Sequence, residues 1–457
     1  MPDTKKRKQS TGASSAKVYP IFAKKTKLDT SEPSDATPID ASAVADAFQQ
    51  LLDFSQVTTE NDAVERLGQV ANTLIRSFRL VVKRDEPGTT DDKKGDGETG
   101  TGGDAEAVET EFEVLEAECY LLIGGGIHED PFTHGSEEQK ISGRWYFHRA
   151  PRFSKDSTRS LTSGTEYRDG TRKGLDLTLG GPPTSSAAEG RSRYFAASSE
   201  DSSIGTKTPS AGQGSSAAKL NNGLLCGGVL LRTIREVKTG KITSGPSLLV
   251  DRILAASGAN GIKDLVDNKW HADISAFNHP QAGSDSSTSP RTDMRGTRLY
   301  LKAVRARTEG EQKIYCSPRI GLDLSHPGTT NSTTLPLHPR IRFLPRRYRF
   351  FLHPELLTAN GRPQTFLGVL DSLVPPAETP SDELVARIKK PSLSKDIARI
   401  VGIKEGTSAK YLKDYVAGTE GGAVLLNEFI GTKGKGASSS PTTYLKMMGA
   451  ISMLNIS

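Results

Sequence analysis

The chain has 457 residues, of which only 35% are hydrophobic while 45 are glycine and 25 are proline, a composition too polar for one continuous globule. The formal charge of +6 favours polyanionic partners. No apolar run approaches the ~20 residues that span a bilayer, and the three distant cysteines suit neither a secreted disulfide framework nor a metal site. We therefore expect no membrane partner and a reducing compartment.

Residues 1–40 form a polar tail that we expect to be disordered. The tail carries two basic clusters across a short spacer, Lys5-Lys6-Arg7-Lys8 and Lys24-Lys25-Thr26-Lys27. This pattern is typical of a nuclear localisation signal, although a solvated basic tail has the same composition. The tail therefore predicts that the protein acts in the nucleus.

Composition divides the rest of the chain. Residues 42–82 predict two helices, and residues 84–106, rich in Gly, Asp, Glu and Thr, predict a linker. The main folded region extends over 108–352 and is interrupted at 181–219 and 277–292 by low-complexity insertions that cannot bury apolar surface and are expected to be disordered. Apolar positions of the second helix recur at helical spacing, at Val64, Leu67, Ala71, Leu74, Ile75 and Phe78.

The main region mixes several strand patterns with few helix patterns, which favours an α+β domain over a doubly wound sheet. Helices are predicted at 245–257, where Pro246 occupies the first turn, and at 261–267. A helical C-terminal extension with a flexible Gly/Ser stretch is predicted over 381–457. The predicted strands lie near 111–122, 143–149, 173–180, 225–235, 297–306, 312–320 and 340–351.

The segment Leu115–Leu121 carries the most informative chemistry of the chain. Because side chains alternate along a strand, Glu116, Glu118 and Tyr120 share one face, and His134 follows downstream. A carboxylate can deprotonate water and offset positive charge at an oxocarbenium-like sugar carbon, while aromatic rings can sandwich a planar base that has left its stack. The simpler alternative is a strand with an exposed acidic face and an incidental histidine.

Six short segments, in the same order, resemble the alkyladenine (3-methyladenine) DNA glycosylase family. The strand Leu115-Glu116-Ala117-Glu118-Cys119-Tyr120-Leu121 looks like that family's Val-Glu-Thr-Glu-Ala-Tyr-Leu strand, and Asp130-Pro131-Phe132-Thr133-His134 looks like its Asp-Pro-Ala-Ser-His segment. The resemblance covers residues 111–343 and leaves the tails and both insertions outside. Gly228-Val229-Leu230-Leu231-Arg232 looks like a strand of the family, and Ser244-Gly245-Pro246-Ser247-Leu248-Leu249 looks like one of its helix starts. Pro318-Arg319-Ile320-Gly321-Leu322 looks like its Pro-Arg-Ile-Gly-Ile segment, and Ile341-Arg342-Phe343 looks like its closing strand.

The resemblance implies a mixed α/β domain with a curved antiparallel sheet. It implies that Glu118 is the general base and that Arg232 helps to hold the water and a phosphate, a strand-end salt bridge being the alternative for Arg232. Glu116 is then the spare, structural carboxylate. Such N-glycosidic hydrolysis needs no metal, no cofactor and no Schiff-base lysine. Tyr120 and His134 would form walls of the base pocket. A backbone carbonyl near Ile320 and Leu322, which also belong to the pocket, would complete the water site.

One segment departs from the family. The family's Tyr-x-Tyr-x-x-Tyr-Gly segment, which supplies a stacking ring and a tyrosine wedge, corresponds here to the stretch that ends at Gly174. Lys173 or Arg172 then takes the wedge position, while Gly170 replaces the stacking ring and Gly180 the pocket asparagine. A lysine cannot fill an abasic gap as a ring does, so the lesion and the mode of base flipping stay open. Candidate replacement rings, which equally suit core packing, are Trp145, Tyr146, Phe147 and Tyr167.

Basic residues with interleaved aromatics surround this departure and predict a surface for the DNA backbone, whose contacts dominate affinity. A second basic run extends from Arg340 to Arg349 along the predicted strand, with Pro345 interrupting its ladder. A solubilising charged face is the alternative for both runs. The candidate DNA-binding residues are Arg144, Arg168, Arg172 and Lys173.

We therefore expect a monomeric nuclear enzyme of base excision repair, a DNA glycosylase that binds double-stranded DNA. It would hydrolyse the N-glycosidic bond of a flipped, alkylated or deaminated purine. The alternative is a non-catalytic DNA- or chromatin-binding protein that keeps the glycosylase-like fold. In the tail, Val18-Tyr19-Pro20-Ile21-Phe22 is either a docking motif for a repair or replication partner or an incidental apolar cluster.

Overall fold

The computed structural model describes thirteen stretches of the chain: 40–85, 107–133, 135–149, 167–168, 170–182, 225–278, 296–307, 312–325, 338–357, 360–375, 381–431, 434 and 440–454. The expected N-terminal tail before Asp40, with its basic clusters and apolar island, lies outside the described residues. Most of the expected linker and of both expected insertions lies outside them as well.

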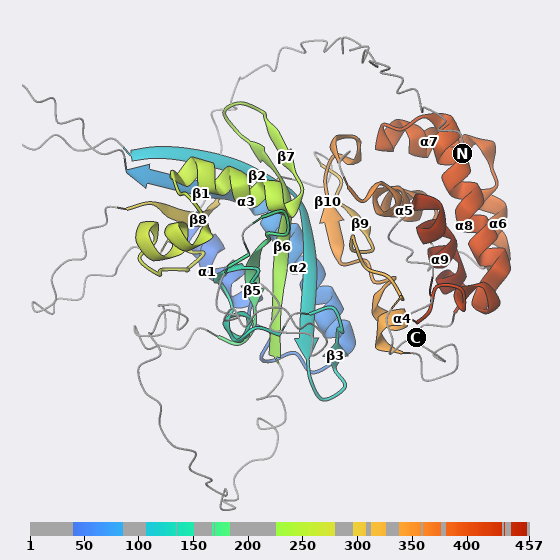
Figure 1. The fold of residues 1–457 in the computed structure, drawn as a ribbon, viewed down its shortest axis with the longest axis horizontal. Coiled ribbons are helices and arrows are strands. Elements are labelled where there is room, and N and C mark those ends of the chain that lie inside the picture. Colours follow the sequence, from blue (N-terminus) through green and yellow to red (C-terminus); the bar gives the residue numbers. More distant parts are fainter. Residues whose placement is uncertain are drawn as a thin grey trace, which may run out of the picture. The chain divides into compact units, whose positions relative to one another are not determined.

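Two helices and a strand open the described fold (Figure 1). The Asp40 side chain accepts backbone hydrogen bonds at the start of α1 (Ala41–Leu51), and Thr59 does so at the start of α2 (Glu60–Ser77). These side chains satisfy N–H groups that a helix start leaves open. Both helices agree with the prediction, but the end of the predicted helical segment belongs to strand β1 (Phe78–Asp85), because its β-branched, apolar run lies between two neighbouring strands.

In the described part of the chain, ten strands form one curled sheet in which every pair is antiparallel. Besides β1, they are β2 (Ala107–Ile123), β3 (His128–Glu129), β4 (Trp145–Phe147), β5 (Leu175–Leu179), β6 (Leu225–Glu236), β7 (Ile242–Ser244), β8 (Arg298–Ala303), β9 (Tyr315–Ser317) and β10 (Arg349–Phe351). Their order is β4-β5-β6-β2-β1-β8; in addition, β2 pairs with β3 and β10, β6 with β7, and β9 with β10. Together with the helices, this sheet confirms the predicted α+β fold.

Strand β2 organises the sheet. One of its edges pairs with β6 along most of its length, whereas the other edge is shared, by β1 opposite residues 107–113 and by β10 opposite 116–118. The register with β6 shifts on both sides of Glu116. Such irregularities re-aim side chains and are frequent beside functional sites. Glu116 and Glu118 therefore lie where β10 takes over from β1.

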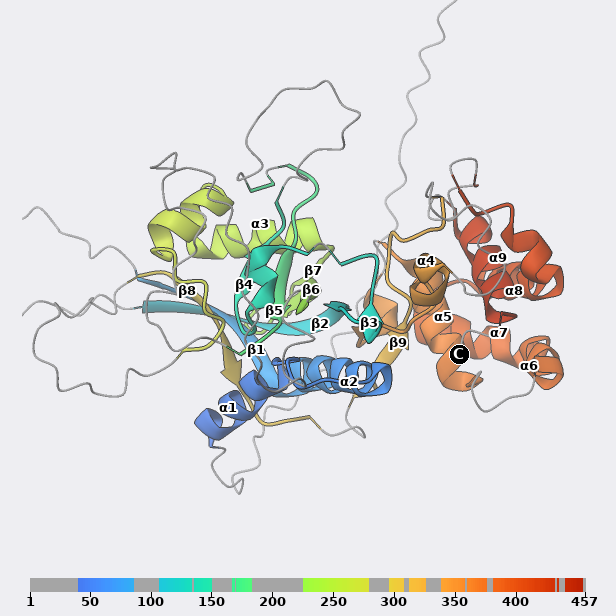
Figure 2. The ribbon, with the colours of Figure 1, turned by 90° about the horizontal axis from the view of Figure 1, so that it is seen from below.

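Helices cover both faces of the sheet. Figure 2 shows α1 and α2 on one side and α3 (Pro246–Ser257) on the other. Gly245, with φ of 109°, precedes α3, and Gly258, with φ of 61°, ends it, in agreement with the predicted helix. A 3₁₀ turn, Glu137–Lys140, precedes β4. The next predicted helix is a π-helix, Asp264–Lys269, rather than an α-helix.

The predicted strand over 340–351 is wrong in its first part. Its start is a short helix, α4 (Pro339–Phe343), and the strand β10 takes up only the last three residues. Proline at the first helical position has a suitable φ, and the His338 side chain accepts a hydrogen bond from the Arg340 N–H at 3.1 Å. The segment that resembles the closing strand of the glycosylase family therefore lies in a helix.

The C-terminal part is helical and has an apolar core of its own, in which side chains of α5 (Arg362–Leu373) cluster with those of the later helices. No element was predicted at α5, whereas the later helices lie inside the predicted extension. Among the described residues, no helix is both long and apolar enough to cross a bilayer. The remaining elements are a 3₁₀ turn (Pro354–Leu356), α6 (Ser381–Ile388), α7 (Pro391–Val401), α8 (Glu405–Leu426) and α9 (Pro441–Ser452).

Candidate active site

Six charged side chains are buried around the glutamate-bearing face of β2. Three carboxylates balance three guanidinium groups, and each residue is less than 10% exposed. A buried charge is costly unless it is paired, so the stability of the cluster depends on this balance. The alternative of an exposed acidic face is wrong. The six residues are Glu116, Glu118, Asp130, Arg232, Arg319 and Arg349.

Glu118 is fully buried, and its carboxylate accepts three hydrogen bonds. Oε2 accepts from the Tyr120 hydroxyl and from Arg232 Nη1, both at 3.1 Å, and Oε1 accepts from the backbone N–H of Ile320 at 2.8 Å. Burial, with the Glu118 charge as the second cause, raises the pKa of Tyr120 well above its ordinary value, so this phenol keeps its proton. The backbone group that meets Glu118 is an N–H, not the carbonyl that the family resemblance implies.

Glu116 lies in a second set of contacts on the same face. Its Oε1 accepts from Arg349 Nε at 2.6 Å and from Arg232 Nε at 3.2 Å, and its Oε2 accepts from the Thr233 hydroxyl at 2.5 Å. Burial alone would raise the pKa of Glu116, but the charges of Arg349 and Arg232 and the hydrogen bond from Thr233 lower it. Arg232 thus joins the two glutamates, which is the salt bridge expected as the alternative for this residue.

Arg349 connects β2 to the C-terminal helices. Besides Glu116, it donates from Nη1 to Ser317 Oγ and from Nη2 to Thr365 Oγ1, each at 3.0 Å. Arg349 is fully buried, so these contacts form without competition from solvent. The position of α5, which carries Thr365, is therefore fixed relative to the glutamates.

Arg319 holds the Tyr120 ring in place. Its guanidinium donates to both carboxylate oxygens of Asp130, at 2.5 and 3.1 Å, and to the Cys119 carbonyl at 3.1 Å. The centre of the guanidinium lies 4.5 Å from the Tyr120 ring centroid, which suits a cation–π contact. Neither Arg319 nor Asp130 had a predicted role, although both belong to segments that resemble the glycosylase family.

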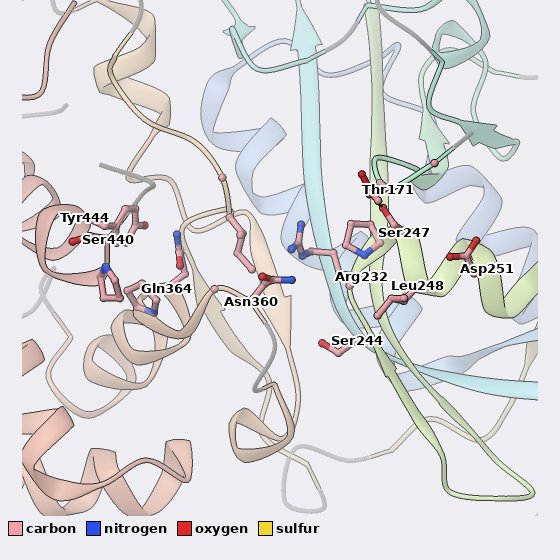
Figure 3. A pocket seen from close by; sticks show the side chains of 18 residues that line it. Thr171, Arg232, Ser244, Ser247, Leu248, Asp251, Asn360, Gln364, Ser440 and Tyr444 are labelled. Atoms are coloured by element: carbon pink, nitrogen blue, oxygen red, sulfur yellow. Dashed lines mark hydrogen bonds between the residues drawn. The ribbon is translucent and has the colours of Figure 1, made fainter. Parts of the chain in front are cut away.

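A cleft of about 910 Å³ adjoins the charged cluster. Arg232 and Ile320, which both donate to Glu118, line it, whereas Glu118 is absent from the described lining residues. Figure 3 shows Arg232 and Asn360 facing one another across the cleft. The described lining residues are Gly170, Thr171, Arg232, Ser244, Gly245, Pro246, Ser247, Leu248, Asp251, Ile320, Gly321, Asn360, Gly361, Pro363, Gln364, Ser440, Pro441 and Tyr444.

The predicted pocket residues are brought together only in part. Tyr120 and Ile320 meet Glu118, as described. Leu322 is half-buried and packs against the C-terminal core instead of lining the cleft. His134 lies outside the described residues.

Lys173 lies beside the cleft. Its Nζ pairs with Asp251 Oδ1 at 2.7 Å, and its backbone N–H donates to Ser247 Oγ at 3.0 Å, and both partners line the cleft. Arg172 is exposed next to Thr171, another lining residue. Both basic residues are therefore near the position expected for a rim that contacts DNA.

The other predicted DNA contacts are less accessible. Arg144 and Arg168 are half-buried. Arg340 stacks its guanidinium over the Phe132 ring with 4.8 Å to the centroid. The remaining arginines of the second basic run pair with carboxylates: Arg342 and Arg346 with Glu60, Arg347 with Asp371, and Arg349 with Glu116.

Two glycines of this region, Gly180 in place of the family's asparagine and Gly174 aligned with its glycine, have no room for a side chain. A Cβ at Gly180 would overlap the backbone carbonyl of Lys140, and a Cβ at Gly174 would press on the His148 ring. The family's asparagine therefore could not occupy the position of Gly180. The candidate replacement rings belong to the core, where Trp145, Tyr146 and Phe147 are buried and Tyr167 packs on Phe147.

The second wall of the cleft was not predicted. It comes from Asn360, which precedes α5, from Gln364 in the first turn of α5 and from Tyr444 in the first turn of α9. Tyr444 is the one aromatic residue among the described lining residues. No sequence motif predicted these residues, because they lie outside the stretch that resembles the glycosylase family.

Fold and site define an α+β protein with a curled antiparallel sheet, a buried carboxylate–guanidinium cluster and a cleft closed by C-terminal helices. The chain is similar to the uncharacterized protein L759 of Acanthamoeba polyphaga mimivirus, with 27% identity over 213 residues, which is 47% of this chain and 69% of the viral protein. No family model and no solved structure matches the chain. The resemblance to the alkyladenine glycosylase family therefore rests on the six segments alone.

Proposed function

We propose that this protein is a DNA glycosylase that hydrolyses the N-glycosidic bond of a flipped, damaged purine, with Glu118 as the general base. The supporting observation is the meeting of Tyr120, Arg232 and Ile320 on the Glu118 carboxylate, next to a cleft of about 910 Å³. Glu118 is the residue to which the family resemblance gives the role of general base, and Arg232 is the one that it expects beside the water. The substrate is double-stranded DNA, and the proposal includes a monomeric protein in the nucleus.

In the proposed reaction, the Glu118 carboxylate takes a proton from a water molecule while the water oxygen forms a bond to C1′ of the sugar. The bond between C1′ and the purine nitrogen breaks, and its electron pair leaves with the base. A base that leaves as an anion, such as hypoxanthine, takes up one proton, and Glu118 gives up the proton that it took from water, so the carboxylate is regenerated. The products are a free base and an abasic sugar, and water is the only co-reactant. The negative charge of Glu118 also offsets the positive charge that develops on the sugar.

One observation favours a second candidate, a non-catalytic DNA- or chromatin-binding protein that keeps the fold. Glu118 has an exposed fraction of 0%, and Arg232 and Ile320, which both contact it, line the cleft. On this view the charged cluster is structural, and DNA binds in the cleft without reaching the carboxylate. Turnover of a lesion distinguishes the two candidates.

The test compares the wild-type full chain with Glu118→Gln under single-turnover conditions. Duplexes that contain hypoxanthine or an alkylated adenine are incubated with excess protein, and abasic sites are revealed by alkali. A positioned general base contributes about 10²–10⁴-fold to rate, so Glu118→Gln should lose at least 100-fold while duplex affinity stays within a few-fold. Glu113→Gln is the matched control, because Glu113 lies on the same strand and pairs with Arg235 away from the cleft.

Each outcome separates the candidates. Absence of alkali-labile product from the wild type on both lesion classes rejects the glycosylase. Duplex affinity that falls steeply with salt, without product, then supports the binding protein, because neutralised phosphates release counterions. Affinity that responds neither to lesion nor to salt rejects both candidates.

A further inference from the structure

Two buried polar groups on the C-terminal wall of the cleft have no partner in the part of the chain that the structure describes. They are the Gln364 side-chain Oε1 and the Tyr444 hydroxyl. Gln364 is 4% exposed and Tyr444 is 2% exposed, and both residues line the cleft. Buried polar groups are almost always hydrogen-bonded, and an unsatisfied one costs about 1–3 kcal/mol. These two groups are therefore placed for a ligand.

Both side chains are held on rigid elements. Gln364 precedes Thr365, whose hydroxyl accepts from the buried Arg349, so the first turn of α5 is tied to the charged cluster. Tyr444 belongs to the first turn of α9, which Ser440 caps by accepting from the Thr443 N–H at 3.1 Å. The backbone positions of both residues are therefore fixed beside the cleft.

Close backbone packing fixes α9 as well. A Cβ at Gly418 of α8 would overlap the Lys446 carbonyl, and a Cβ at Gly449 of α9 would overlap the Tyr415 carbonyl. The two helices therefore touch backbone to backbone, which leaves α9 little freedom to shift. In Figure 3, Gln364 and Tyr444 lie together on one wall, opposite the wall that carries Ser247 and Asp251.

The chemistry of the two groups restricts the ligand. The Gln364 Oε1 atom only accepts hydrogen bonds, so it requires an N–H or O–H donor and is unsuited to a phosphodiester of the DNA backbone, whose oxygens are all acceptors. Burial raises the pKa of Tyr444, so its phenol stays protonated and can donate to an acceptor. A purine edge presents a donor next to an acceptor, for example N1–H beside the C6 carbonyl of hypoxanthine.

We propose that α5 and α9 recognise the hydrogen-bonding edge of a purine base through Gln364 and Tyr444. This inference takes its substrate class, a purine in DNA, from the proposed function. Its new element is that the base is recognised by a C-terminal segment outside the stretch that resembles the glycosylase family. The cleft, at about 910 Å³, has room for a base together with its sugar. Gln364 and Tyr444 are then specificity residues, while Glu118 performs the chemistry.

The variants Gln364→Met and Tyr444→Phe test this assignment. Each removes an unpartnered polar group with little change of volume, so the thermal midpoint should stay the same or rise. Affinity for a duplex that contains 2′-fluoro-2′-deoxyinosine, whose hypoxanthine resists hydrolysis, should fall about tenfold in each variant, while affinity for undamaged duplex should not change. Tyr415→Phe is the matched control, because Tyr415 of α8 is buried in the same C-terminal core as Tyr444 and its hydroxyl bonds to Ser452. It should lower the thermal midpoint and keep lesion affinity.

The failures of the two proposals are distinguishable. If both variants bind the lesion duplex as the wild type does, or if both lose stability, the recognition role is wrong and the glycosylase can still stand. If the wild type shows neither turnover nor lesion preference, calorimetry with free hypoxanthine decides. Binding that Gln364→Met weakens at least tenfold supports base recognition without glycosylase activity, whereas no binding to the wild type, or equal binding to the variant, rejects it.

Discussion

Replacing Glu116 by glutamine preserves the shape of the side chain but removes the charge that faces Arg349 and Arg232. The Thr233 hydroxyl can turn to accept from the new amide, so the lost hydrogen bonding is small. Arg349 is 0% exposed and keeps only neutral partners, Ser317 and Thr365, among its described hydrogen bonds. Breaking a buried ion pair by neutralising one partner costs about 3–5 kcal/mol.

Urea unfolding of the full chain at pH 7 measures this loss. With a denaturant slope of about 3 kcal/mol/M, the midpoint should fall by about 1–1.7 M. In a double-mutant cycle with Arg349→Met, the two substitutions should be non-additive by about 2 kcal/mol or more, because each removes the partner of the other. The control is Glu111→Gln on the same strand, whose partners Arg79 and Lys302 are partly exposed and should cost less than about 1 kcal/mol. The reasoning is refuted if Glu116→Gln costs no more than the control or if the cycle is additive.

The same variant has a pH signature. The pKa of Glu116 is lowered in the folded state, because Arg349, Arg232 and Thr233 outweigh the effect of burial. The carboxylate therefore contributes stability that is fully present above its ordinary value of 4.5 and is lost as pH falls toward the lowered folded pKa. The midpoint difference between wild type and Glu116→Gln should shrink between pH 5 and pH 3. If the midpoint difference stays constant from pH 5 to pH 3, the pKa of Glu116 is not lowered on folding and the reasoning is contradicted.

Two further predictions concern the cleft wall and a half-buried histidine. In calorimetry, Gly361→Ala should lower the thermal stability more than Gly240→Ala. Both glycines have positive φ (75° and 70°), but only at Gly361 would the new Cβ overlap a side chain, that of Ile320. Equal losses would show that the overlap relaxes. Burial lowers the pKa of His148, but the charge and hydrogen bond of Asp176 raise it overall, so its stabilising contribution is present below the ordinary value of 6.5 and is lost as pH rises through the raised folded pKa. Thermal midpoints of wild type and His148→Gln should therefore converge with rising alkalinity, and midpoints that stay parallel from pH 6 to 9 would contradict the raised value.

The fold was predictable where the pattern of apolar residues is regular. The alternation of β2 and the helical spacing of α2 are regular in this sense, and both elements form as expected. Helix α5 is different, because its residues 364–370 are all buried, so no polar face gives it a period. The prediction of a strand over 340–351 was wrong in its first part for a local reason. Pro339 favours the start of a helix, and the alternating arginines that follow are compatible with a helix as well as with a strand.

The site divides in a similar way. Glu116, Glu118 and Tyr120 are neighbours on one strand, so period-two geometry predicted that they share a face. Arg319 and Arg349 reach that face only because distant segments fold onto β2, and no local pattern gives that arrangement. The contacts from the C-terminal helices were beyond sequence reasoning for the same reason.

The position of Arg232 gives the two glutamates different but connected roles. Its Nε contacts Glu116 and its Nη1 contacts Glu118, so one guanidinium divides its charge between them. Arg349 donates to Glu116 as well, so Glu116 accepts from two guanidinium groups while Glu118 accepts from one. Under the proposed reaction, the structural carboxylate therefore shares the guanidinium of Arg232 with the catalytic one. Arg349, which also donates to Thr365, connects this pair to α5.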